Sequence, residues 1–182
     1  MLRVNLVARI AGDKNSFPDL VKLAHQLKQQ GVTDFLVTFI GAIEDQGIYQ
    51  NIITIAEQLD VSHHIAFTGK SIPMAELSDE LKSGYFLNFT VGSFMGYSSI
   101  DSINLGFKTI FCNCDAYLTG EQYDYINVCR NLDEVANLLL LINKDAGTVD
   151  KQIMTNNQLM KQSFLLTAAE ASQLKNLMLP NG

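Results

Sequence analysis

The alternation of apolar and polar stretches along the chain predicts strands and helices in turn. Short β-prone apolar runs cover residues 2–8, 34–41, 64–68, 85–91, 108–113 and 126–129, and runs of this length are typical of buried strands. Between them, apolar residues recur at helical spacing over residues 17–30, 48–59, 73–83, 98–105 and 132–143. Strands that alternate with helices predict a parallel sheet with helices on both faces.

This order of elements predicts the fold class. We expect a Rossmann-like, three-layer α/β/α fold whose parallel sheet has about six strands in the order 3-2-1-4-5-6. From Thr148 the pattern changes, because leucines and methionines are spread among polar residues without a strand signal, and we expect one or two C-terminal helices. The chain thus divides into a domain over residues 1–147 and a helical segment over residues 148–182. Because a core strand starts at the first residues, we expect a piece of a longer protein.

The stretch from Phe89 to Asp115 has the pattern most typical of a binding site. A strand end is followed by Gly92 and Gly96, then by a short helix that Gly106 ends at its C′ position, then by a new strand. The N–H groups and the positive dipole end at the start of a helix favour phosphate. In the expected sheet, this turn lies beside the loop after the first strand. We therefore expect a ligand between residues 9–14 and 92–101.

Composition narrows the classes of function. The 182 residues carry a formal net charge of −6, and no Lys/Arg cluster is present, which argues against a nucleic-acid partner. The longest apolar run, Leu138 to Ile142, is too short to span a membrane and no signal-peptide pattern is present, so we expect a cytoplasmic protein. Cys112, Cys114 and Cys129 have no ligand spacing to the histidines, so we expect reduced thiols and no metal.

The motifs of the chain resemble those of a known family. The Arg9-x4-Lys14 loop, the Phe67-x-Gly69 turn and the glycine turn with its helix are similar to the C-terminal, donor-binding domain of GT-B glycosyltransferases of the family 4 (group 1) type. The resemblance covers residues 4–144. It implies binding of a nucleotide-diphosphate sugar such as a UDP-sugar, without a metal or other cofactor. It also implies retaining transfer to a glycan or glycolipid, which a missing N-terminal domain would bind, at the inner membrane face.

The resemblance also assigns roles to residues, none of them certainly catalytic. The implied contacts are, for the diphosphate, Arg9, Lys14, Gly96, Tyr97 and Ser98; for the ribose, Asp101; for the nucleobase, Gly69, Ser71 and Ile72; and for the sugar, Ser93, Phe94 and Met95. In that family the last helix crosses to the N-terminal domain. The apolar residues of the C-terminal segment should then be exposed or covered by a second copy in a homo-oligomer, and they are Ile153, Leu159, Met160, Phe164 and Leu165.

Some alternatives stay open. Arg9 and Lys14 also fit solvated loop cations. Ser98 and Asp101 have the spacing of a capping box, in which the acidic side chain bonds back to the start of its helix. Ser93 stands where the family has a glutamate near the sugar, which leaves a catalytically inactive scaffold or partner-binding module as a second function.

Overall fold

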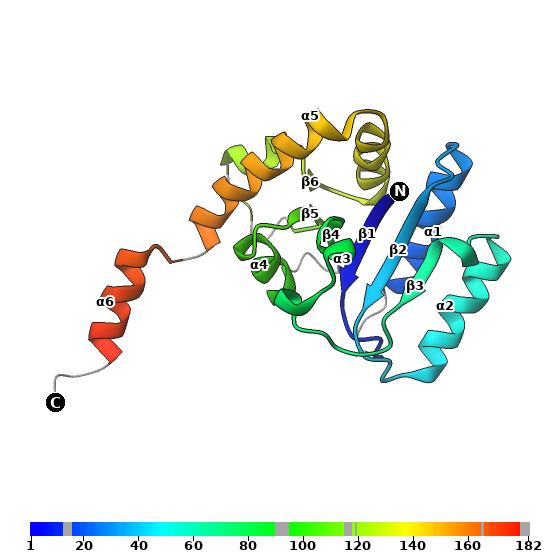
Figure 1. The fold of residues 1–182 in the computed structure, drawn as a ribbon, viewed down its shortest axis with the longest axis horizontal. Helices are drawn as coiled ribbons and strands as arrows, with labels where there is room; N and C mark the ends of the chain where they lie inside the picture. Colours follow the sequence, from blue (N-terminus) through cyan, green and yellow to red (C-terminus); the bar gives the residue numbers. More distant parts are fainter. Residues whose placement is uncertain (13–15, 90–94, 115–117, 119, 165, 179–182) are drawn as a thin grey trace.

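The structure is a computed structural model, and it describes residues 1–12, 16–89, 95–114, 118, 120–164 and 166–178. In the described part, six strands form one sheet in the order β3-β2-β1-β4-β5-β6, and every neighbouring pair is parallel (Figure 1). The expected fold class and strand order are therefore confirmed.

The elements follow one another as the sequence predicts. The strands are β1 (Leu2–Val7), β2 (Phe35–Ile40), β3 (Ile65–Phe67), β4 (Tyr85–Phe89), β5 (Lys108–Cys112) and β6 (Val128–Cys129). The helices are α1 (Phe17–Gln29), α2 (Gln46–Gln58), α3 (Asp79–Lys82), α4 (Tyr97–Asn104), α5 (Leu132–Phe164) and α6 (Ala168–Met178), with 3₁₀ turns η1 (Ser62–His64), η2 (Met74–Glu76) and η4 (Gly120–Asp124).

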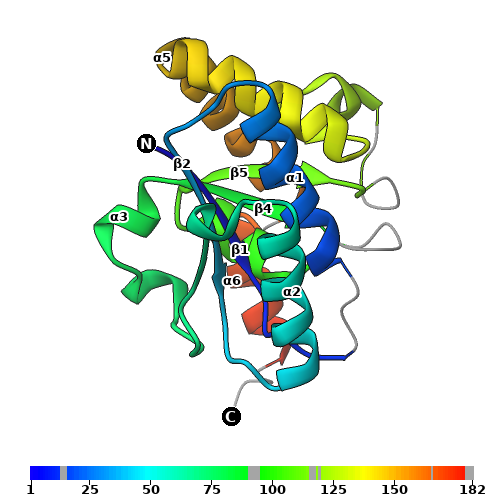
Figure 2. The ribbon, with the colours of Figure 1, turned by 90° about the vertical axis from the view of Figure 1, so that its right-hand side faces the viewer.

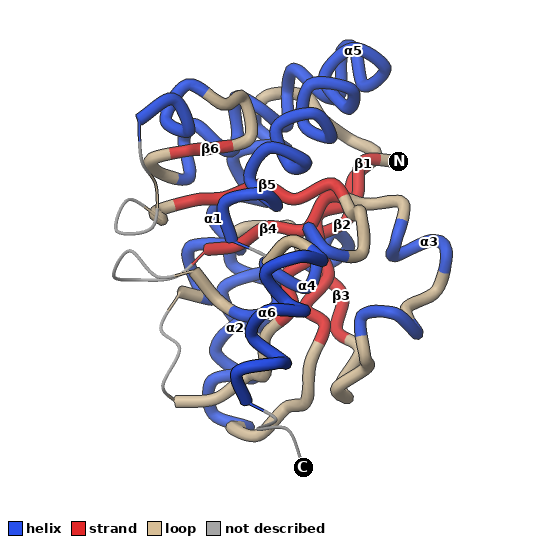
Figure 3. Tube along the Cα trace, turned by 90° about the vertical axis from the view of Figure 1, so that its left-hand side faces the viewer, coloured by secondary structure: helices blue, strands red, loops and turns tan. Residues whose placement is uncertain are grey.

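The sheet is buried on both faces. In β1, Val4 and Leu6 belong to the main core cluster with α1 and α2, whereas Val7 packs in a separate cluster with residues of η2. Figure 2 looks onto the face that α1 and α2 cover, and Figure 3 looks onto the opposite face, where α3 and α4 lie. Burial on both faces explains why the strands lack a clean alternation of apolar and polar residues.

Two glycines end helices as the sequence predicts, and one predicted helix is wrong. Gly31 follows α1 with a φ of 83° and Gly106 follows α4 with a φ of 77°, a conformation that only glycine adopts without strain. The single helix expected over residues 73–83 is instead η2 followed by α3. Leu77 and Ser78 are extended between them, because the Ser78 hydroxyl accepts a hydrogen bond from the N–H of Leu81 and starts a new helix.

Helix α5 continues past Thr148, where the sequence pattern predicted a separate C-terminal segment to begin. Asp145, with φ −147° and ψ 73°, interrupts it, and the second half over residues 146–164 packs on the domain. Ile153 and Met160 are 0% exposed there, so the expectation that they are exposed or covered by a second copy is wrong. The side chain of Asn157, also buried, donates to the carbonyl of Phe107 at 3.1 Å. The domain boundary at residues 147/148 stays a prediction.

Helix α6 has no buried residue and stands away from the sheet (Figure 1). Leu159 on α5 is 42% exposed, and Leu177 on α6 is 81% exposed. The side chain of Phe164 and all of Leu165 lie outside the described residues. Self-association through these helices stays a prediction. None of the described helices is both long and apolar enough to cross a membrane.

Candidate functional site

The carboxyl ends of β1 and β2 are tied together beyond the strands. Ile10 forms an isolated parallel bridge with Ile43, and its N–H donates to the carbonyl of Ala42 at 2.8 Å. Gly41 allows this approach, since a Cβ there would lie 2.1 Å from the carbonyl oxygen of Ala8. The backbone next to Arg9 is therefore held against the segment that follows β2.

Arg9 lies at the carboxyl edge of the sheet, where the sequence predicts a phosphate site. Its Nη1 donates to Glu44 Oε2 at 2.9 Å, and the two side chains are 50% and 48% exposed. An ion pair this exposed contributes little to stability and can exchange its carboxylate for another anion. Lys14, the second predicted cation, lies outside the described residues.

The loop after β3 reaches the same edge. Thr68 Oγ1 accepts a hydrogen bond from the N–H of Gly41 at 3.0 Å and donates to the carbonyl of Lys70 at 2.9 Å. Gly69 turns the chain with a φ of 67°. Ser71 is exposed, whereas Ile72 packs partly against the cluster beneath η2. The predicted nucleobase residues are thus brought near the end of β2, and contact with a base stays a prediction.

The start of α4 is fixed by a side chain from β4. Asn88, 6% exposed, accepts through Oδ1 from the N–H of Gly96 at 3.1 Å and from Ser99 Oγ at 2.5 Å. Its Nδ2 contacts Cys114 Sγ at 2.8 Å. Gly96 is the N-cap of α4, and because it is a glycine it has no side chain that could cap the helix. One amide thereby joins the ends of β4, α4 and β5.

The predicted residues around α4 have different surroundings. Tyr97 is 84% exposed at the first helical position, while Met95 is 6% exposed and packs in the core with Phe111. Asp101 is exposed. The capping box with Ser98 is wrong, because the N-cap is Gly96 and Ser98 is already inside the helix. Ribose binding by Asp101 stays a prediction, and Ser93 and Phe94 lie outside the described residues.

Sequence reasoning missed Asn88 at this edge, and it missed the pairing of Glu44 with Arg9. The signal for Asn88 was an amide within the apolar run Tyr85–Phe89, since a polar side chain in a buried strand needs partners. Glu44 had no local signal, because its partner Arg9 is 35 residues away.

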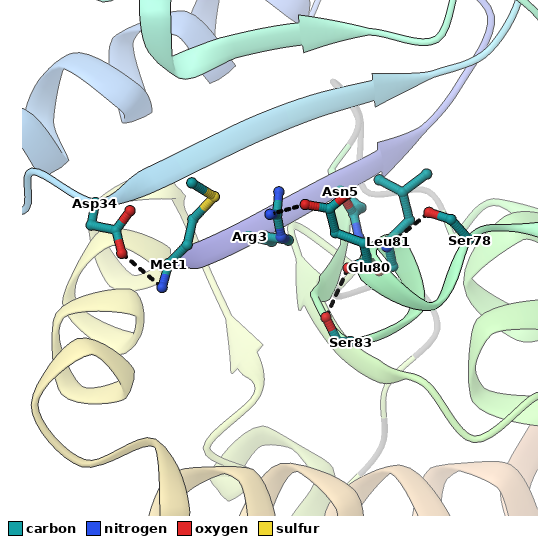
Figure 4. A network of polar contacts seen from close by, with 8 residues as sticks. All are labelled: Met1, Arg3, Asn5, Asp34, Ser78, Glu80, Leu81 and Ser83. Carbon is teal, nitrogen blue, oxygen red and sulfur yellow. Dashed lines mark hydrogen bonds and ion pairs between the residues drawn. The ribbon is translucent and has the colours of Figure 1, made fainter.

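A second polar cluster lies at the opposite, amino edge of the sheet (Figure 4). A cavity of about 310 Å³ there is lined by Met1, Arg3, Tyr85, Lys108 and Asp150 among others. The amine of Met1 pairs with Asp34 at 2.8 Å, Arg3 pairs with Glu80, and Lys108 pairs with Asp150 at 3.1 Å. Each cation thus has a carboxylate, so the cluster has no excess of positive charge for an anion.

The Tyr85 hydroxyl belongs to this cluster and donates to Asp150 Oδ1 at 2.6 Å. Burial, and then the neighbouring Asp150 carboxylate, raise the pKa of Tyr85 above its ordinary value. The phenol therefore stays protonated, and it links β4 to the second half of α5.

The three cysteines are buried and reduced, as the sequence predicts. Burial, with a smaller effect of Glu134, raises the pKa of the Cys129 thiol to about 12. Over the part of the chain that the structure describes, no three His, Cys, Asp or Glu side chains lie together as a metal site would require.

Comparison with known proteins shows what the fold is similar to. No family profile and no curated protein matches the sequence. A glycosyltransferase from Rickettsia africae superposes with a TM-score of 0.72 at 15% identity, over 100% of this chain and 49% of that one. Anabaena HepE in complex with UDP and glucose gives 0.71 at 11% identity, over 97% and 48%. The chain thus spans about half the length of these two proteins.

A third structure is a single domain. The C-terminal domain of the group 1 glycosyltransferase LpcC from Francisella tularensis superposes with a TM-score of 0.63 at 12% identity, over 86% of this chain and 82% of that domain. The chain has the fold of the C-terminal domain of GT-B group 1 glycosyltransferases, as the resemblance in its sequence indicated.

Proposed function

We propose that this chain is a glycosyltransferase domain that binds the nucleoside diphosphate of a sugar donor, most simply UDP, at the carboxyl edge of its sheet. The observation that carries the proposal is the convergence of Arg9, the loop after β3 and the start of α4 at this edge. Nucleotides bind at this edge in open parallel sheets of this order. HepE, which shares the fold, was solved with UDP and glucose.

Each part has a chemical role in the proposal. Arg9 exchanges Glu44 for a phosphate oxygen, because a guanidinium presents paired donors that fit phosphate. The first amides of α4, at Tyr97 and Ser98, add hydrogen bonds and the positive end of the helix dipole. Together with Lys14 they stabilise the negative charge that develops on the departing diphosphate, so that no metal is needed.

The whole reaction needs more than this domain. We propose that a second domain binds the glycan or glycolipid acceptor, since the chain spans about half of the two full-length glycosyltransferases compared above. Transfer would retain the configuration of the sugar. On its own the chain should bind the nucleotide and transfer nothing.

The test is calorimetric titration of the chain with UDP. A charge-assisted contact to phosphate contributes roughly 1.5–3 kcal/mol, so Arg9→Ala should weaken binding about tenfold or more. Arg9→Lys keeps the charge but loses the paired donors and should fall between wild type and Arg9→Ala. Lys22→Ala removes one positive charge from an exposed Lys22–Asp19 pair on α1 and should bind like wild type.

Two outcomes would count against the proposal. Equal affinity in wild type and Arg9→Ala would remove the phosphate contact from this loop. Absence of any heat or thermal stabilisation with UDP would instead favour the second candidate, a scaffold without catalysis. The observation that favours this candidate is Ser93 at the position where the family has a carboxylate.

A further inference from the structure

The start of α4 is stabilised in an uncommon way. Ser, Thr, Asp or Asn usually caps a helix from the N-cap position. Here the N-cap is Gly96. The N–H of Gly96 and the hydroxyl of Ser99 both donate to the side-chain oxygen of Asn88, which lies on the preceding strand. Asn88 is buried, so its side chain is held by its surroundings as well as by its bonds.

The same helix start is electrically different from the others. Each other described α-helix has an acidic residue in its first turn or at its N-cap, and these are Asp19 in α1, Asp45 in α2, Asp79 and Glu80 in α3, Asp133 and Glu134 in α5, and Glu170 in α6. Helix α4 has none. A carboxylate at this place would neutralise the positive end of the dipole.

We propose that Asn88 is a positioning residue for the phosphate site. Its neutral amide oxygen holds Gly96 and Ser99, and thereby the first turn of α4, without adding negative charge. The positive end of the helix stays available for the ligand's diphosphate. This inference rests on the proposed function.

The chemistry of the side chain separates this role from packing. Asp has almost the same shape as Asn and can accept the hydrogen bonds from Gly96 and Ser99 through a charged oxygen. An Asp carboxylate cannot donate, however, so it loses the contact from Nδ2 to Cys114 Sγ and places a charge in a buried position. It differs by one negative charge beside the helix start. Ala instead removes the acceptor and leaves the N–H of Gly96 and the hydroxyl of Ser99 without it, which costs stability.

The experiment compares Asn88→Asp with wild type in calorimetric titrations with UDP, UMP and uridine at about pH 8, where a carboxyl group that accepts two hydrogen bonds is ionised. Thermal unfolding without ligand is measured in parallel. Asn88→Asp should unfold below the wild-type temperature, because it buries a charge and loses the contact to Cys114, and it should bind UDP at least about tenfold more weakly. UMP should lose less than UDP, and uridine should stay within about twofold, because Coulomb repulsion scales with ligand charge.

Two further variants complete the design. Asn104→Asp adds the same charge on an exposed residue at the far end of α4 and should bind UDP within about twofold of wild type. Asn88→Ala should lose thermal stability together with affinity, for uridine as well as for UDP.

The contradicting results are distinct. Wild-type UDP affinity in Asn88→Asp would overturn the inference, and so would an equal loss for UDP and uridine, which would mean that the residue acts through shape alone. An Asn88→Asp protein that does not fold would also overturn it, since the bonds to Oδ1 would then be insufficient to hold this region. If wild type itself binds no UDP, the proposed function fails and this inference fails with it.

Discussion

The substitution Ile153→Ala tests whether the second half of α5 belongs to the core of this domain. Ile153 is 0% exposed and packs in the main hydrophobic cluster with residues of the first half of α5, such as Leu139. The sequence instead indicated a segment that docks elsewhere. The two views predict different free energies of unfolding for the same change.

The size of the effect follows from the atoms removed. Ile→Ala deletes three carbon groups, each contributing about 0.8 kcal/mol when buried, and the cavity left behind adds to the loss. We expect a decrease of about 3 kcal/mol in the free energy of unfolding, or about 6–12 °C in melting temperature for a chain of this length. Leu159→Ala, on the same helix but 42% exposed, should cost less than about 1 kcal/mol.

Urea unfolding followed by circular dichroism measures both variants. The slope of free energy against urea should stay constant, so that midpoints can be compared directly. A loss below about 1 kcal/mol for Ile153→Ala, no larger than for Leu159→Ala, would refute the packing of this half-helix.

Two other predictions concern the backbone near the site and the buried thiols. Gly41→Ala should destabilise the fold by about 3 kcal/mol or more, because its Cβ would meet the backbone of Ala8 at 2.1 Å. Gly31→Ala has no atom within 4 Å of its Cβ and should cost only about 1–2 kcal/mol for its positive φ. Equal losses of the two variants in urea unfolding would contradict this. Cys129 should react with iodoacetamide at about pH 8 only after unfolding, since burial raises its pKa to about 12 and thiolate is the reactive form. Rapid labelling of the native protein, measured by mass spectrometry, would contradict the burial of this thiol.

The sequence by itself determined the fold class, because the signals for it are local. Period and length distinguish strands from helices, and Gly31 and Gly106 mark helix ends through a backbone conformation that depends on one residue. The right-handed rule for crossovers then leaves few strand orders, and the observed order is the expected one. The carboxyl edge followed from the same rule, and with it the position of Arg9.

Tertiary structure alone decided which side chains meet at that edge and where the C-terminal residues pack. Glu44 meets Arg9 across 35 residues, and Asn157 meets Phe107 across 50, so no local pattern contains either pair. The spacing of Ser98 and Asp101 fitted a capping box, yet the helix starts at Gly96, where the buried amide of Asn88 binds. A buried polar group must find partners wherever the fold brings them, so a contact between distant segments prevailed over a correct local spacing.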